Sequence, residues 1–179
     1  MKKELGSILA LYPTPAVLVG TMAGNKPDWT LIAHVGIIAH DHLLISMMKE
    51  HYAAPFIRQN KVFTIQSVTE KLLKLADYAG TVSGNDTDKS HLFPWHAGKT
   101  GAPIIDEAPL AIECRVDDIY EHPIFDNFIA TIETVWADES ILDEKGRIDY
   151  NIFKPVLFEF PTYQYVKAGD LIGPCRKMH

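Results

Sequence analysis

Two long segments with alternating side chains constrain the fold of this chain more than any other feature. Leu110–Glu121 and residues 127–137 each alternate apolar and polar positions, and a short connection joins them. In the first segment Ile112, Cys114 and Val116 share one face, opposite a face of polar and small residues. Alternation at a period of two is typical of β-strands with one buried side. The sequence therefore predicts a mainly β fold.

Shorter runs of the same kind fill most of the remaining chain. Further strands are predicted at residues 16–21, 29–34, 43–48, 62–67, 156–160 and 163–167, and helices at residues 3–11, 52–59 and 69–78. Residues 83–107 lack a regular pattern and are expected to form a long loop. Because helices interrupt a mainly β order, the pattern favours a β-barrel with helical insertions over a parallel α/β sheet.

Composition narrows the class of protein. A length of 179 residues suits a single domain, which we expect to span residues 1–179. The net charge of −6 argues against nucleic acid as a partner. No apolar run reaches the ~18 residues of a membrane helix, and no signal peptide is evident, so we expect no membrane association. Cys114 and Cys175 do not make a disulfide framework, and we expect a reducing, cytoplasmic location.

Several familiar catalytic and cofactor motifs are missing. The sequence has no G-x-G-x-x-G, no Walker A loop, no G-x-S-x-G and no H-E-x-x-H. His40 and His42 flank Asp41, but a solvated turn explains this pattern better than a metal site. We therefore predict no metal, and the catalytic residues remain unknown at this stage.

One stretch, residues 62–89, suits an anion. A buried strand runs into a helix that begins at Ser67 or Thr69, and the helix ends near Gly80. The following turn, residues 83–89, supplies hydroxyls, a glycine backbone and the ammonium group of Lys89. Backbone N–H groups and a lysine at such a turn can bind a phosphate.

Four motifs together resemble a known family. They are Tyr-Pro-Thr-Pro-Ala-Val-Leu-Val at residues 12–19, Asp-Trp-Thr-Leu-Ile-Ala at 28–33, Phe-Thr-Ile-Gln-Ser at 63–67, and Ala-Gly-Thr-Val-Ser-Gly-Asn-Asp-Thr-Asp-Lys at 79–89. The chain is similar to the flavin reductase-like, FMN-binding split-barrel proteins, and particularly to their flavoredoxin-like branch. The resemblance extends over residues 12–160.

This resemblance implies a fold, a cofactor and an activity. The expected fold is a six-stranded Greek-key split barrel, usually a homodimer, with FMN as the cofactor. The expected activity is that of an NAD(P)H-dependent flavin reductase-like oxidoreductase, which passes electrons to flavin and on to a small-molecule or protein acceptor. Because the flavin carries the chemistry, no acid–base triad is expected. The alternatives are a non-enzymatic flavoredoxin-type electron carrier and a split-barrel binding protein for another anionic aromatic ligand.

The resemblance also implies a set of FMN-binding residues. Those expected near the flavin ring are Trp29, Thr30, Leu31, Ile32, Ala33, Met47, Gln66, Ser67 and Val68. Those expected near the phosphate are Lys49, His51, Tyr52, Ser83, Gly84 and Lys89. Structural roles compete with these assignments. Trp29 can be a packing residue, Ser67 can be only a helix cap, and at most one of Met47 and Met48 can face a pocket because they are adjacent on a strand. Whether Trp95 reaches the flavin stays open.

The chain departs from the branch at one point. Where the branch often has Arg-Tyr-Thr, this sequence has His51-Tyr52-Ala53. An arginine and a hydroxyl that would bind the phosphate are therefore missing, and Lys49 or a protonated His51 are the candidates to replace them. We hypothesise that FMN binds more weakly than in a typical member.

Overall fold

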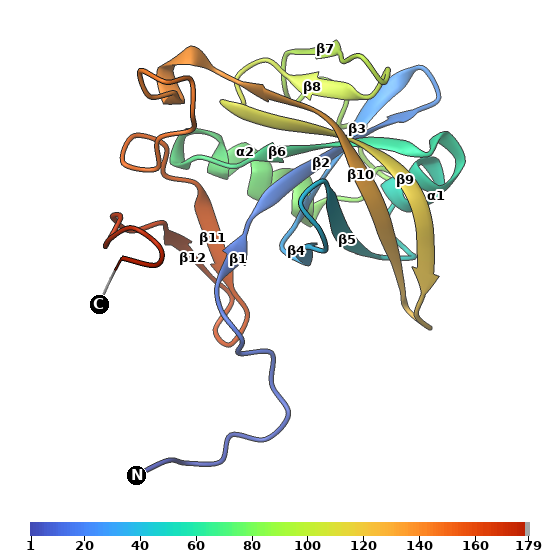
Figure 1. Cartoon of the computed structure of the whole chain (residues 1–179). Helices are drawn as coiled ribbons and strands as arrows, with labels where there is room; N and C mark the ends of the chain where they lie inside the picture. Colours follow the sequence, from blue (N-terminus) through green and yellow to red (C-terminus); the bar gives the residue numbers. More distant parts are fainter. Residues whose placement is uncertain (178–179) are drawn as a thin grey trace.

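The computed structural model describes residues 1–177 and is mainly β, with two α-helices (Figure 1). The strands are β1 (Thr14–Pro15), β2 (Val17–Ala23), β3 (Lys26–Ile32), β4 (Val35–Ile37), β5 (His42–Met48), β6 (Val62–Ser67), β7 (Trp95–Ala97), β8 (Pro103–Ile105), β9 (Leu110–Glu121), β10 (Phe125–Ala137), β11 (Val156–Glu159) and β12 (Gln164–Lys167). The helices are α1 (Ala53–Asn60), α2 (Glu70–Thr81) and the short 3-10 helix η1 (Glu139–Ile141).

The main sheet curls until its two edges meet. Its seven strands are antiparallel and lie in the order β3-β2-β6-β9-β10-β5-β4. The edge strands β3 and β4 are separated in the chain only by Ala33 and His34. Since an extended residue spans at most about 3.6 Å, this link holds the two edges within roughly 11 Å of each other. The expected split barrel is confirmed, with seven hydrogen-bonded segments in place of six strands because β3 and β4 form one interrupted strand.

The strand order contains the expected Greek key. Strands β2, β3–β4 and β5 follow one another as neighbours, and the chain then crosses through α1 to place β6 beside β2. A fourth strand that returns to pair with the first defines this motif. The long predicted strands β9 and β10 pair with each other and separate β6 from β5.

Alternating residues of β2 build the two parts of the core. Val17 and Val19 point into the barrel, whereas Leu18 points outward beneath α2. The outer cluster includes Leu72 of α2 and Trp29 of β3. The apolar face of α2 therefore packs against the outside of the sheet, and this packing fixes the end of α2 beside β3.

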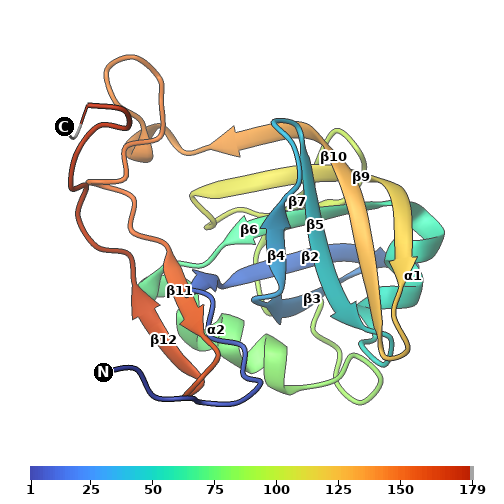
Figure 2. The ribbon, with the colours of Figure 1, turned by 60° about the horizontal axis from the view of Figure 1, so that its bottom comes forward.

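A separate small sheet lies outside the barrel. β11 pairs with β1 on one side and with β12 on the other, and Figure 2 shows this hairpin beside α2, close to β2 and β4. The hairpin combines the predicted strands at residues 156–160 and 163–167. The hairpin brings Phe158, Phe160, Tyr163 and Tyr165 to the edge of the barrel.

Two local expectations differ from the structure. Residues 3–11 form no helix and are exposed, because Leu5, Ile8 and Leu9 meet no apolar surface, and a short helix without packing is unstable in water. The irregular stretch at residues 83–107 contains the small hairpin of β7 and β8. Within the described residues, no helix has the length and apolar character needed to cross a membrane.

A buried carboxylate fastens the β7–β8 hairpin to the barrel. Glu113 on β9 is fully buried, and its Oε1 accepts hydrogen bonds from Lys99 N (3.0 Å) and Trp136 Nε1 (2.7 Å). Its Oε2 accepts from Thr100 N (2.7 Å) and Thr100 Oγ1 (2.6 Å). Burial raises the pKa of Glu113, but these hydrogen bonds outweigh burial and hold its pKa below the ordinary value.

We expect Glu113→Gln to lower the free energy of unfolding by about 1–3 kcal/mol at pH 7, because an amide turns an N–H toward donors that need an acceptor. The depressed pKa makes the carboxylate's contribution fully present above the unfolded pKa, about 4.3, and it is lost as pH falls through the lower folded pKa. The difference from the wild type should therefore shrink below about pH 4.

Urea unfolding at several pH values measures this effect. Glu133→Gln is the matched control, because Glu133 pairs with Arg115 on the surface, and its loss should cost at most about 1 kcal/mol. Equal stability of the Glu113→Gln protein and the wild type at pH 7 would contradict the assigned role.

Candidate functional site

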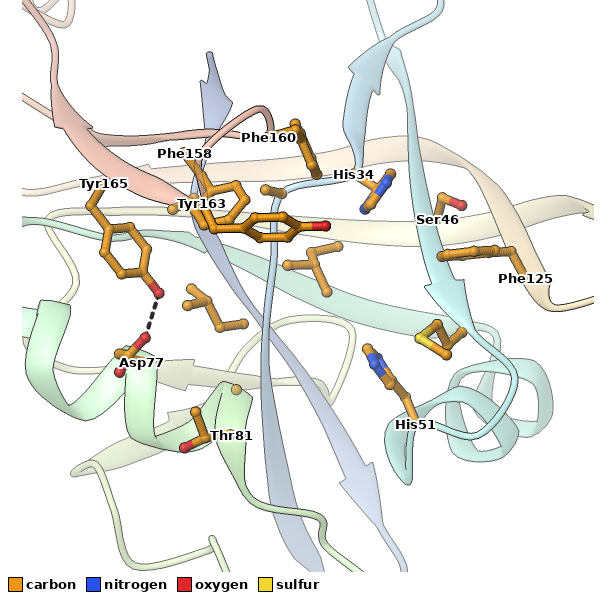
Figure 3. Close-up of a pocket in the computed structure, with 16 residues that line it drawn as sticks. His34, Ser46, His51, Asp77, Thr81, Phe125, Phe158, Phe160, Tyr163 and Tyr165 are labelled. Carbon is orange, nitrogen blue, oxygen red and sulfur yellow. Dashed lines mark hydrogen bonds between the residues drawn. The ribbon is translucent and has the colours of Figure 1, made fainter. Parts of the chain in front are cut away.

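Two neighbouring clefts, which share Met48, His51, Gly80 and Thr81 in their linings, lie where β3 meets the end of α2. The first, here called the aromatic cleft, has a volume of about 430 Å³ (Figure 3). It is lined by Ala16, Leu31, Ile32, Ala33, His34, Ser46, Met48, His51, Asp77, Gly80, Thr81, Phe125, Phe158, Phe160, Tyr163 and Tyr165. The second, here called the polar cleft, has a volume of about 340 Å³. It is lined by Thr30, Met48, Glu50, His51, Tyr52, Ala79, Gly80, Thr81, Val82, Ser83, Gly84 and Lys89. Both volumes are in the range of small-molecule sites.

The link between β3 and β4 forms the floor of the aromatic cleft. Thr14 Oγ1 donates to the Ala33 carbonyl at 2.7 Å, and Ser46 N donates to the His34 carbonyl at 2.9 Å. These bonds hold an irregular backbone segment in place at the point where the sheet closes. His34 lies in this break between the strands, and its side chain faces the cleft (Figure 3).

The β11–β12 hairpin forms the opposite wall. Phe158, Phe160 and Tyr163 pack against one another, with ring centroids 5.2 Å apart for the first two and 5.9 Å for Phe158 and Tyr163. Tyr165 donates its hydroxyl to Asp77 Oδ1 of α2 at 2.6 Å, the dashed line in Figure 3. Burial and the neighbouring Asp77 raise the pKa of Tyr165. The hairpin is therefore fastened to α2 across the cleft.

Glycines give the polar cleft its shape. A Cβ on Gly80 would stand 2.9 Å from Leu31 Cβ, so a glycine lets α2 end close against β3. A Cβ on Gly84 would overlap the ring of Tyr52. The turn that contains Gly84 is held by the Ser83 carbonyl, which accepts from Asp86 N (3.1 Å) and Thr87 N (2.9 Å). The two glycines therefore let the backbone approach closely at the end of α2 and at this turn.

Lys89 lies in the polar cleft but is already engaged. Its side chain is 2% exposed, and Nζ lies 3.2 Å from Asp28 Oδ1. Nζ also donates to the carbonyls of Trp29 (2.5 Å) and Ala79 (3.4 Å). Burial lowers the pKa of Lys89 and raises the pKa of Asp28, and each partner opposes that effect on the other. All three donors of Lys89 have acceptors, and the pair adds little net charge to the cleft.

His51 lies at the junction of the two clefts. It lines both, and its Nδ1 is buried without a hydrogen-bond partner among the described residues. Burial lowers the pKa of His51, the positive charge of Lys89 lowers it further, and Glu50 raises it. His51 is therefore mainly neutral at pH 7 in the free protein. Because His51 lines both clefts, it can contact a ligand that spans them.

The structure brings together nine of the predicted FMN-binding residues. The aromatic cleft contains Leu31, Ile32, Ala33 and His51, and the polar cleft contains Thr30, His51, Tyr52, Ser83, Gly84 and Lys89. Six others line neither cleft. They are Trp29, Met47, Lys49, Gln66, Ser67 and Val68.

Side-chain direction explains three of these six. Met47 is fully buried inside the barrel, and the adjacent Met48 lines both clefts instead. Trp29 is fully buried under α2 and packs edge-on against Phe93, with centroids 5.8 Å apart. Lys49 points toward Glu121 and Asp126, at 3.5 and 3.9 Å. Lys49 is therefore not the free cation near the phosphate that the sequence suggested.

Gln66, in β6, and Val68, just after it, make contacts within the fold and line neither cleft. Gln66 is buried, pairs with Leu18 and Ala111 in the sheet, and donates from Nε2 to Thr64 Oγ1 at 2.6 Å. Val68 is fully buried, and its carbonyl accepts from Val156 N. Trp95, in β7, also lies outside both clefts.

Sequence reasoning missed the residues of the β11–β12 wall, together with His34, Ser46, Asp77 and Phe125. One signal was present. Phe158, Phe160, Tyr163 and Tyr165 alternate around Pro161, which is a dense group of aromatic residues for two short strands. Their direction could not be read from the sequence.

No metal-binding group of three or more His, Cys, Asp or Glu side chains is present in residues 1–177. His42 instead contacts Asp41 Oδ1 through Nδ1 at 2.6 Å and Thr131 Oγ1 through Nε2 at 3.2 Å.

The sequence model of the flavin reductase like domain matches residues 9–167. The chain belongs to the flavin reductase-like family. A comparison with curated protein sequences gives no match.

Solved structures of this family resemble the chain over nearly its whole length. The flavoredoxin of Desulfovibrio vulgaris (Miyazaki F) has a TM-score of 0.93 and 33% identity, covering 99% of both chains. The flavoredoxin of Methanosarcina acetivorans has a TM-score of 0.93 and 29% identity, covering 99% of this chain and 97% of its own. An FMN-binding protein from Thermus thermophilus shares the fold at a TM-score of 0.82 and 21% identity, covering 97% of both chains.

For this flavin reductase-like chain, we expect Lys89→Met to destabilise the ligand-free protein by about 3–5 kcal/mol, because Asp28 would remain buried without its partner. The double variant Asp28→Asn with Lys89→Met should recover part of the loss. Thermal or urea unfolding of the ligand-free protein measures both. Lys26→Met is the control, since the Lys26–Asp88 pair is exposed. A wild-type stability for Lys89→Met would mean that Lys89 serves a ligand and not the fold.

Proposed function

We propose that this protein binds FMN along the two neighbouring clefts and acts as an oxidoreductase. The observation that carries the proposal is that a polar and an aromatic cleft lie side by side and share lining residues, His51 among them. FMN has the same division, with a phosphate and a polyol chain at one end and a planar ring at the other. The family and the FMN-binding structural neighbour support a flavin.

The residues present fit these two ends. Thr30, Ser83 and the backbone at Gly84 would hold the phosphate and polyol through hydroxyl and N–H donors. Leu31, Ile32 and Ala33 would line the ring, where backbone groups at a strand break can bond its polar edge. His51 would contribute from the junction. When bound, the flavin would supply the hydride and electron chemistry, and the chain would orient the ring and shield it from water.

We further propose that a reduced nicotinamide nucleotide supplies the electrons and that an acceptor takes them from the flavin. The flavin reductase-like domain match supports this reading. A second candidate is a flavoredoxin-type electron carrier without NAD(P)H turnover. It is favoured by the similarity to two flavoredoxins, each of which is covered over at least 97% of its length.

We expect FMN to bind more tightly at pH 6.5 than at pH 8.5. His51 is neutral in the free protein, because burial lowers its pKa, and a bound phosphate dianion favours its charged form. Binding therefore takes up a proton, and affinity rises as pH falls toward the pKa of free His51. Below about pH 6 the phosphate itself takes up a proton, so the gain should stop there. Titration of the FMN-free protein, followed by flavin fluorescence, measures the dissociation constant.

Two variants isolate His51 in this titration. His51→Ala should remove most of the pH dependence, and His51→Arg should give tighter binding that varies little from pH 6.5 to 8.5, since arginine stays charged. Lys49→Met is the control and should leave affinity nearly unchanged, because Lys49 points away from both clefts. Nanomolar, pH-independent binding by the wild type would refute the assignment.

NAD(P)H consumption separates the two candidate functions. For a flavin reductase-like enzyme, we expect FMN-loaded protein to oxidise NADH or NADPH catalytically, at a rate that increases with added free flavin. A carrier would show no such turnover and would be reduced by a partner protein instead. Boiled protein with the same FMN controls for the free cofactor. Failure of the protein to bind FMN would contradict both candidate functions.

A further inference from the structure

Aromatic rings wall the outer half of the aromatic cleft. The ring centroid of His34 lies 4.8 Å from that of Phe160, in the β11–β12 connection, and 5.5 Å from that of Phe125 in β10. Phe158 and Tyr163 continue the wall. Rings attract other rings in stacked or edge-on geometry, so a planar aromatic ligand suits this wall better than an aliphatic one.

Charge restricts that ligand further. Of the described residues that line the aromatic cleft, none is a lysine or arginine, and Asp77 is the single carboxylate. The Asp77 carboxylate already accepts a hydrogen bond from Tyr165. The two histidines of the cleft, His34 and His51, have pKa values lowered by burial and are mainly neutral at pH 7. Any positive charge that His51 gains on FMN binding is balanced by the FMN phosphate. A sulfonate, carboxylate or phosphate on a second ligand would therefore meet no free counter-charge here, so an uncharged ligand is favoured.

His34 and Tyr163 offer hydrogen-bond donors to this uncharged space. His34 is an exposed residue of the cleft lining, and its ring makes no hydrogen bond to any described residue, so its neutral imidazole keeps one N–H for a ligand. Figure 3 shows the Tyr163 ring extending across the cleft from the hairpin. Donors in an aromatic, uncharged cleft fit a carbonyl oxygen on a planar ring.

Glu159 holds the backbone of the turn that contains Tyr163. The Glu159 carboxylate accepts hydrogen bonds from Thr162 N (3.0 Å) and Gln164 N (3.0 Å), on either side of Tyr163. Tyr163 itself has a φ of 57°, which a residue with a side chain seldom adopts. The turn therefore fixes Tyr163 over the cleft in a conformation that packing alone would not select.

We propose that the electron acceptor is an uncharged, planar aromatic carbonyl compound of the quinone class, bound in the aromatic cleft with His34 and Tyr163 donating hydrogen bonds to its oxygen. This inference rests on the proposed FMN-dependent function. The quinone takes two electrons and two protons from the reduced flavin and leaves as the hydroquinone, while the flavin returns to its oxidised form. His34 and Tyr163 are positioning residues in this step.

A matched pair of compounds tests the charge argument. We expect 1,4-naphthoquinone to bind oxidised, FMN-loaded protein at least tenfold more tightly than 1,4-naphthoquinone-2-sulfonate, by isothermal titration calorimetry. The two differ by one sulfonate, which the cleft cannot neutralise. In anaerobic mixing, chemically reduced FMN-loaded protein should convert naphthoquinone to its hydroquinone faster than it converts the sulfonate. Equal binding of the two compounds would overturn the proposal.

Matched variants test the two donors. His34→Phe and Tyr163→Phe keep a ring and remove a donor, and each should weaken naphthoquinone binding about three- to tenfold. His91→Ala is the control, because His91 is exposed and lines neither cleft. Unchanged affinity in both donor variants would overturn the assigned hydrogen bonds.

The same titrations on FMN-free protein separate this inference from the proposed function. Protein that binds FMN but does not prefer the neutral quinone would refute the acceptor class alone. Protein that prefers the neutral quinone but never binds FMN would refute the proposed function and leave the selectivity of the cleft in place.

Discussion

The closure of the main sheet through two residues determines where this molecule can hold a ligand. A seven-stranded sheet whose edge strands are joined by Ala33 and His34 must curl, and its regular pairing must break at that link. The two carbonyls at the break are held by Thr14 and Ser46, from β1 and β5. Both clefts open along this break or beside it. A barrel closed by regular pairing would offer no such irregular backbone to a cofactor.

The second constraint is the buried Asp28–Lys89 pair. It joins β3 to the turn after α2, and the carbonyls of Trp29 and Ala79 complete the set of acceptors around the ammonium group. The one lysine that lines the polar cleft is therefore engaged in contacts that stabilise the fold. A phosphate in that cleft must then rely on backbone N–H groups, hydroxyls and whatever charge His51 can acquire. A histidine at position 51, which is not permanently charged as an arginine would be, therefore matters more here than it would beside a free lysine.

Local patterns in the sequence were sufficient for much of the fold. The strands β6 and β9 have the predicted bounds, because each carries a clear apolar run or alternation. Leu31, Ile32 and Ala33, which their motif suggested for a binding site, line a cleft. Features that depend on distant partners were not predictable. The direction of Lys89 depends on Asp28, far back in the chain, and the choice between Met47 and Met48 depends on which face of β5 meets the barrel interior.

The aromatic hairpin has a consequence for the order in which the site is assembled. All strands of the main sheet lie between Val17 and Ala137, whereas the wall that covers the aromatic cleft comes from β11 and β12, after Val156. A chain made from its N-terminus thus has every barrel strand available before its cover is synthesised. A ligand of the aromatic cleft that meets the protein at that stage would find the cleft open on the side that the hairpin later covers. Ligand capture can then precede the final docking of the hairpin, and no later opening movement is required to admit it.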